Sequence, residues 1–258
     1  MLLSSVAISD LGSIRSENQD NLYINGAFRR DVSDKLAFRR SNTCLTRGLY
    51  AVADGMGGEE NGAAAALTAV NCLDKQEHNI TSIESYLLER NAVLCGMIEE
   101  NGGCRMGTTF AGLCIDGDAA DIINIGDSRI YLFRDNALTQ LSRDHTVIRP
   151  MLEMGILTPE TARTHPARHK LSQHLGIFPE ELIIEPYTAH VDLKPDDLFL
   201  LCSDGLTDEL EDEEIEAILR LSAGLPETAE ELFAGALRKG ARDNITILLV
   251  QAEREPKN

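Results

Sequence analysis

The sequence predicts an α+β protein in which antiparallel sheets stack on one another and helices pack on the outside. Two features of its 258 residues indicate this class. Short apolar segments of strand length follow one another in runs separated by turn residues. Longer segments with helical spacing of apolar residues come in pairs, apart from those runs. Such a separation of strands from helices is typical of stacked sheets with helices on their outer faces.

The N-terminal part predicts two strands, 4–9 and 21–25, joined by a polar bend. The next segment, 26–47, is longer than a hairpin loop needs to be. We interpret it as a twisted, solvent-facing hairpin, and a docking patch for an acidic partner is the alternative. Its basic residues are Arg29, Arg30, Lys35, Arg39, Arg40 and Arg47.

The turn after Asp54 has the pattern of a strand, a tight bend and a helix. An apolar run ends at Asp54, and three of the next four residues are glycines, which allow backbone angles that other residues avoid. Residues 59–76 then have the alanine content of a buried helix. A second helix is predicted over 83–100, with Thr81 and Ser82 as candidate caps.

The middle of the chain predicts three short strands, 107–115, 119–125 and 129–133. Asp127 would therefore lie between two strands of one meander. The segment of about 144–180 breaks the strand pattern, and its prolines would bound short helices. We interpret it as a flap beside the functional site.

The C-terminal part returns to strands at 183–193 and 197–202, followed by helices at about 212–221 and 227–239. A last strand, 245–250, completes a sheet. No Pro-, Ser- or Gly-rich linker divides the sequence. The expectation is one domain, 1–258, with the flap inside it.

Four aspartates occupy equivalent positions, each at one end of an apolar strand: Asp54, Asp127, Asp204 and Asp243. Carboxylates that converge in apolar surroundings repel one another and lose hydration unless a cation lies between them. Oxygen ligands without nearby His or Cys indicate a hard cation, Mg²⁺ or Mn²⁺, rather than zinc or copper.

The net charge of −18 excludes a nucleic acid as partner, because phosphate backbones require a basic surface. It also argues against an anionic membrane surface, and no apolar run approaches the roughly 20 residues of a spanning helix. The acidic stretch 208–216 is interpreted as the solvated first turns of a helix. Six cysteines without a CxxC pair indicate reduced thiols, so we expect a cytoplasmic protein.

Six short motifs, in order, resemble the metal-dependent serine/threonine protein phosphatases of type 2C, in particular the compact bacterial ones. The resemblance covers nearly the whole chain. It sharpens the fold to a four-layer α-β-β-α sandwich of two antiparallel sheets. The motifs are Arg15-Ser16-Glu17-Asn18-Gln19-Asp20, Asp54-Gly55-Met56-Gly57-Gly58, Gly107-Thr108-Thr109, Gly126-Asp127-Ser128-Arg129, Ser203-Asp204-Gly205-Leu206 and Asp243-Asn244.

The resemblance implies hydrolysis of phosphoserine and phosphothreonine by a water shared between two metal ions, without a phosphoenzyme. It implies that Asp54 bridges two Mn²⁺ or Mg²⁺ ions. Asp204 and Asp243 would complete the coordination of one ion, and the Gly55 carbonyl would be a ligand of the other. Asp127 with Asp204 would hold a third, weaker ion. The partners would be phosphorylated proteins, the substrates of a serine/threonine kinase, and we expect a monomer.

The same resemblance assigns Arg15 to the substrate phosphate, which a guanidinium can bind through two parallel hydrogen bonds. Asp20 would orient metal-bound waters rather than bind a metal directly. Gln19 stands where relatives often have glutamate, and Gln173 where an arginine is common. Met56 replaces a histidine of animal relatives, so the leaving group must take its proton from a metal-bound water or another donor.

Three points stay open at the level of sequence. His165 and His169 could donate protons, but isolated histidines in a polar segment favour surface positions. A phosphatase-like module that only binds a phosphoprotein is a second functional class. An esterase for small phosphorylated metabolites is a third.

Overall fold

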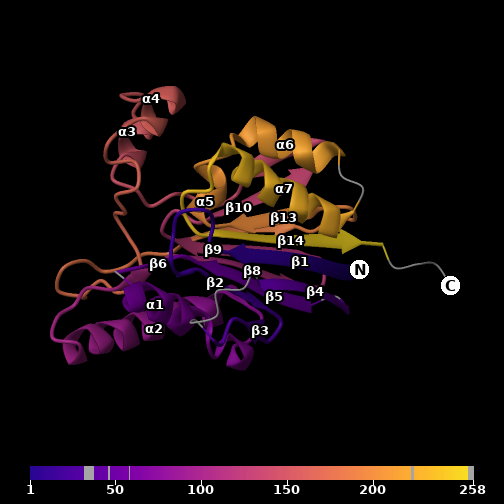
Figure 1. Cartoon of the computed structure of the whole chain (residues 1–258). Coiled ribbons are helices and arrows are strands. Elements are labelled where there is room, and N and C mark those ends of the chain that lie inside the picture. The colour runs from indigo at the N-terminus through magenta and orange to yellow at the C-terminus, as the bar shows by residue number, and fades with distance from the viewer. Residues whose placement is uncertain (32–37, 46, 58, 222–223, 255–258) are drawn as a thin grey trace.

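Two antiparallel sheets form the centre of the computed structural model, which describes residues 1–31, 38–45, 47–57, 59–221 and 224–254 (Figure 1). The first sheet has the order β11 (Ala137–Gln140), β10 (Arg129–Arg134), β13 (Leu198–Cys202), β14 (Ile245–Glu253), β1 (Leu2–Asp10) and β4 (Phe38–Leu45). The second has the order β12 (Tyr187–Asp192), β9 (Ala119–Ile125), β8 (Phe110–Asp116), β5 (Arg47–Ala53), β2 (Asn21–Ile24) and β3 (Ala27–Phe28). A small ladder pairs β6 (Gly55–Met56) with β7 (Gly107–Thr108).

Helices cover the outer face of each sheet (Figure 1). α1 (Glu59–Val70) and α2 (Ile80–Glu100) pack on the second sheet, and α6 (Asp212–Leu221) and α7 (Leu225–Lys239) on the first. Two short helices, α3 (Arg149–Glu153) and α4 (Pro159–Arg163), stand away from the sandwich at one end, where the flap was predicted. The predicted α-β-β-α arrangement is confirmed.

Three apolar layers hold this sandwich together, and β5 contributes to two of them. Leu49 and Ala51 pack with α1 and α2, whereas Tyr50 and Val52 pack between the sheets. Successive strand residues point to opposite faces, so a strand that is apolar on both faces joins two cores. A third layer lies between the first sheet and α6 and α7.

The start of α2 differs from the prediction. The helix begins at Ile80 rather than at residue 83, because the side chain of Asn79 accepts a hydrogen bond from the backbone N of Ser82 at 2.9 Å. Asn79 is therefore the N-cap, and the Thr81–Ser82 assignment was wrong.

Two predicted connections were also wrong. The segment 26–47 is not a hairpin, because β3 pairs with β2 in the second sheet whereas β4 pairs with β1 in the first. Likewise β9 and β10 belong to different sheets, so Asp127 lies where the chain crosses from one sheet to the other. Apolar alternation identifies a strand but not its partner, which explains both errors.

Among the described residues, no helix combines the length and apolarity that a membrane crossing requires. The cysteines whose side chains are described, Cys72, Cys95, Cys104, Cys114 and Cys202, are free thiols, and Cys104 is exposed.

Candidate metal centre

The four predicted aspartates meet in one pocket of about 490 Å³. Asp54 follows β5, Asp127 follows β9, Asp204 follows β13, and Asp243 lies two residues before β14. Two of these strands belong to each sheet, so the pocket lies at one end of the sandwich. Because Leu2 pairs with Glu253 and Asp10 with Ile245, this is the end opposite the two termini (Figure 1). Arg15 and Gly55, also predicted for the site, line the same pocket.

The backbone around Asp54 is fixed by two threonines. The Asp54 N donates to Thr109 Oγ1, and Thr108 Oγ1 donates to the Asp54 carbonyl, both at 2.9 Å. Gly55 must be a glycine, because a Cβ there would lie 2.0 Å from the carbonyl oxygen of Gly62. The sequence motif around Thr108 and Thr109 thus holds Asp54 in place.

The electrostatics of Asp54 reflect crowding of negative charge. Burial raises its pKa well above the usual 3.8, and the charges of Asp20, Asp204, Asp127 and Asp243 raise it further. The carboxyl groups of Asp54 and Asp204 are within hydrogen-bonding reach of each other. Two carboxylates so close require a shared proton or a cation between them.

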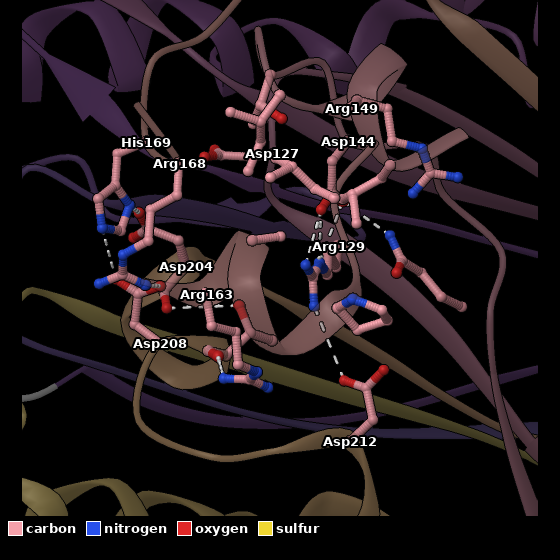
Figure 2. Close-up of a pocket in the computed structure, with 18 of the residues that line it drawn as sticks. Asp127, Arg129, Asp144, Arg149, Arg163, Arg168, His169, Asp204, Asp208 and Asp212 are labelled. Atoms are coloured by element: carbon pink, nitrogen blue, oxygen red, sulfur yellow. Dashed lines mark hydrogen bonds and ion pairs between the residues drawn. The ribbon is translucent and has the colours of Figure 1, made fainter. Parts of the chain in front are cut away.

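His169 is the cationic neighbour of Asp204 (Figure 2). Burial alone would raise the pKa of Asp204. Contacts with His169, whose Nδ1 lies 3.5 Å from Oδ2, and with Asp54, together with the charge of Arg168, lower the pKa instead. His169 is half-exposed and also lies 3.4 Å from Asp208. The sequence favoured a surface position for His169 and gave no sign of these contacts, since the flap residue and Asp204 are distant in the chain.

Asp20 is a buried carboxylate with only one satisfied oxygen. Its Oδ2 accepts hydrogen bonds from Ser203 Oγ and Thr246 Oγ1, both at 2.7 Å. Its Oδ1 has no hydrogen-bond partner among the described residues. Burial raises the pKa of Asp20 to about 7, although the two hydroxyls oppose that shift. Sequence reasoning missed Ser203 and Thr246, since a buried hydroxyl carries no distinctive pattern.

These observations test whether the residues fit a metal ion. The predicted ligands offer carboxylate and carbonyl oxygens, Asp54 and Asp204 crowd each other, and Asp20 keeps an unpaired buried oxygen near Asp54. His169 also lines the pocket, so the expectation that no histidine lies near these carboxylates was wrong. An oxygen-rich set of this kind suits Mg²⁺ or Mn²⁺. A divalent cation would neutralise the repulsion and satisfy the unpaired acceptors, so the residues fit.

Arg15 reaches the pocket from the bend before β2. Its Nη2 donates to Asp243 Oδ2 at 2.7 Å, and this hydrogen bond raises the pKa of Arg15. The residue predicted for phosphate thus contacts one of the predicted metal ligands. Its guanidinium is exposed at the pocket mouth, where a phosphate oxygen can reach it.

Asn244 clamps the bend that carries Arg15. Its Oδ1 accepts from the Gln19 N at 2.8 Å, and its Nδ2 donates to the carbonyls of Glu17 and Leu11 at 2.8 and 3.1 Å. The sequence singled out Asn244 only as part of a motif. One amide side chain therefore joins the N-terminal bend to the start of β14.

The arginines of 26–47 differ in their surroundings. Arg29 is only 4% exposed, and its Nη1 donates to the carbonyls of Asn18 and Asp20, behind the metal centre. Arg39 pairs with Glu230 at 2.8 Å, and Arg47 pairs with Asp116 at 3.1 Å. Lys35 lies outside the described residues. The prediction of a solvent-facing segment is therefore wrong for Arg29.

The two stacked sheets and the aspartates at their common end define a class of protein. It is that of α+β proteins with a carboxylate-rich site suited to hard divalent cations. A model of the protein phosphatase 2C family matches residues 23–238. The chain belongs to this family, as its motifs predicted.

Individual relatives agree with that assignment. The chain is 34% identical over 257 residues to the serine/threonine phosphatase stp of Listeria welshimeri, covering 94% of this chain and 93% of the relative. It is 30% identical over 256 residues to the serine/threonine protein phosphatase PstP of Mycobacterium tuberculosis, covering 96% of this chain but only 45% of PstP. The chain thus spans less than half of that relative.

A solved structure is similar over the whole chain. The catalytic domain of PstP, in complex with two manganese ions, superposes with a TM-score of 0.79 at 29% identity. The alignment covers 98% of this chain and all of that domain. The shared fold therefore extends to the end of the sandwich where the aspartates meet.

Proposed function

We propose that this chain is a metal-dependent protein phosphatase that hydrolyses phosphoserine and phosphothreonine with two Mn²⁺ or Mg²⁺ ions. The observation that carries the proposal is the meeting of Asp54, Asp127, Asp204 and Asp243 in one pocket. The names of the relatives and the manganese ions in the PstP structure support it.

In this proposal the predicted residues share the task of holding the metal ions. Asp54 would contribute to holding both ions, Asp204 and Asp243 would help to hold one of them, and the Gly55 carbonyl would help to hold the other. Asp127 and Asp204 together suit a third, weaker ion. When bound, the ions supply Lewis-acid activation of a water and neutralise charge on the phosphate.

The other residues bind and orient. Arg15 holds the phosphate through its guanidinium, and its contact with Asp243 keeps it beside the metal centre. Asp20 is buried behind the ligands, and its unpaired Oδ1 is suited to orient a water. Gln19 lines the pocket beside them and is proposed to act in the same way. Met56 has no transferable proton, so the leaving group takes its proton from elsewhere.

The proposed substrates are proteins phosphorylated by a serine/threonine kinase, since that chemistry supplies the phosphomonoesters this site would consume. We place the activity in the cytoplasm, where the free thiols of the described cysteines persist. The chain is proposed to act as a monomer, because one chain supplies every residue of the pocket.

The test is manganese-dependent hydrolysis of p-nitrophenyl phosphate and of a phosphothreonine peptide. Asp54→Asn and Asp243→Asn should each abolish turnover, because each removes a charge that faces the ions. Asp118→Asn, in the exposed turn between β8 and β9, is the matched control and should retain it.

Two outcomes would contradict the proposal. Full metal occupancy by calorimetry with no turnover of either substrate would favour a module that only binds phosphoproteins. Faster turnover of nucleotide or sugar phosphates than of the peptide would favour a small-molecule esterase.

A further inference from the structure

A second cavity, of about 540 Å³, lies beside the metal centre between the segment of α3 and α4 and the segment of α5 (Asp204–Thr207) and α6 (Figure 2). We call it the flank cavity. Asp127, His169 and Asp204 line both the flank cavity and the metal pocket. A peptide with its phosphate at the metal centre can therefore extend directly into it. Its volume is in the range of small-ligand sites.

The flank cavity has an excess of negative charge. Eight aspartates and glutamates line it, against four arginines and His169. Each arginine is already engaged by a carboxylate of the cavity: Arg129 by Asp144, Arg149 by Glu153, Arg163 by Glu211 and Arg168 by Asp208. The remaining four carboxylates are two proposed metal ligands, Asp127 and Asp204, and two residues of α6, Asp212 and Glu213.

The excess of negative charge on α6 remains when metal ions neutralise the aspartates of the metal centre. Asp212 accepts a hydrogen bond from the Tyr131 hydroxyl at 2.9 Å and lies 3.8 Å from Arg129, which is already held by Asp144 (Figure 2). Glu213 is exposed and makes no ion pair with any residue that the structure describes. The acidic start of α6, predicted to be a plain solvated face, is thus one side of a cavity.

The other side of the flank cavity carries its apolar side chains, beside Arg149, Glu153 and Arg163, which form ion pairs. Its apolar side chains all come from the segment of α3 and α4: Ile148, Leu152, Leu157, Pro159 and Ala162. Arginine and lysine combine an aliphatic stem, which packs on such a surface, with a charged end that seeks carboxylates. An acidic side chain would instead meet like charge.

We infer that the flank cavity binds an arginine or lysine side chain of the phosphoprotein, and so selects substrates with a basic residue near the phosphorylated one. The inference rests on the proposed function, because it assumes that the phosphate lies at the metal centre. Glu213 and Asp212 are the residues that would meet the basic group. The flap would supply the contact with its stem.

The test compares phosphothreonine peptides in which arginine, alanine or glutamate occupies each flanking position in turn. For the native chain, kcat/KM should be highest with arginine at one position, by about tenfold over alanine. The ratio of kcat/KM for the arginine peptide to kcat/KM for the alanine peptide should fall as the salt concentration rises. Salt screens the attraction between the substrate arginine and Glu213, because Glu213 is exposed to solvent. Glu213→Lys should bring the arginine-to-alanine ratio to about one or below. Glu100→Lys makes the same charge change at the exposed end of α2, on the other sheet, and should leave the ratio intact.

The outcomes separate this inference from the proposed function. Hydrolysis of every peptide with no preference for a basic residue would overturn the inference alone. An arginine preference that Glu213→Lys and Glu100→Lys reduce equally would also overturn it, since net charge rather than the flank cavity would then be responsible. Absence of hydrolysis with any peptide would remove the proposed function, and the inference with it.

Discussion

At the scale of single residues, two hydroxyl groups hold a carboxylate that the fold buries. Ser203 is fully buried, donates to Asp20, and accepts a hydrogen bond from the Thr246 N at 3.0 Å. Ser203 does not line the metal pocket, but its hydrogen bond holds Asp20 in position behind it. Its loss leaves the buried Oδ2 of Asp20 with one hydroxyl donor instead of two.

Ser203→Ala should therefore lower the free energy of unfolding of the metal-free protein by about 1 to 3 kcal/mol. Urea denaturation measures the change. Ser85→Ala, on the exposed face of α2, is the control, and its effect should stay within about 0.5 kcal/mol. Equal changes in the free energy of unfolding for the two substitutions would show that the hydrogen bond from Ser203 to Asp20 does not stabilise the protein.

His174 gives a residue-scale prediction of pH dependence. Burial lowers its pKa, Arg105 lowers it further, and the bond to the Leu175 carbonyl and the charge of Glu181 oppose the shift. The unfolded chain therefore takes up a proton at higher pH than the folded one. Stability from this group is complete above the unfolded pKa of about 6.5, and it falls as pH decreases through the folded pKa.

NMR titration of the His174 ring should place its pKa below about 6.5. His174→Gln should flatten the decline of unfolding free energy in that acidic range. A pKa above that of a free histidine would contradict the structure, because it would mean that the ring is charged where it is packed.

At the scale of elements, one ion pair joins the flap to the first sheet. Arg129, at the start of β10, donates to both carboxylate oxygens of Asp144 at 2.7 to 3.1 Å and to the Tyr131 hydroxyl at 2.9 Å. Asp144 is the first residue of the predicted flap, and its side chain is only 13% exposed. The position of the flap thus depends on a mostly buried pair.

Arg129→Met should cost about 3 to 5 kcal/mol of unfolding free energy, because it leaves Asp144 with an uncompensated charge. Arg143→Ala removes one partner of the exposed Arg143–Glu153 pair nearby, and it should cost less than about 1 kcal/mol. Thermal and urea denaturation of both variants measure the difference. Similar losses of unfolding free energy for the two variants would show that the buried Arg129–Asp144 pair contributes no more to stability than the exposed Arg143–Glu153 pair.

At the scale of the whole molecule, the net charge of −18 and the aspartate cluster both destabilise the folded state. Both oppose compaction through repulsion, and the cluster concentrates this repulsion where the two sheets end. A cation bound there relieves it locally, whereas dissolved salt only screens the general charge.

Mn²⁺ should therefore stabilise the native chain by about 2.7 kcal/mol at one hundred times its dissociation constant. Asp54→Asn should lose most of this gain. Thermal denaturation with Mn²⁺ is compared with sodium chloride at the same ionic strength. Equal stabilisation by the two salts would show that the cluster binds no specific ion.

Much of this organisation could be predicted from local sequence. Alternating apolar residues, glycines after Asp54 and the acidic start of α6 identify strands, a tight turn and a helix without any distant contact. The four aspartates could be selected because each stands at a strand end. Local patterns carry these facts since backbone preferences act over a few residues.

The sequence by itself thus determined the layered class, the family and the identity of the aspartates. Only the tertiary structure decided that β9 and β10 lie in different sheets, that Arg29 is buried behind Asp20, and that His169 meets Asp204. It also decided that acidic residues of α6 share a cavity with the apolar side chains of the segment of α3 and α4. The physical reason is that strand pairing and burial depend on which distant surfaces fit together, and a local pattern of residues does not specify that fit.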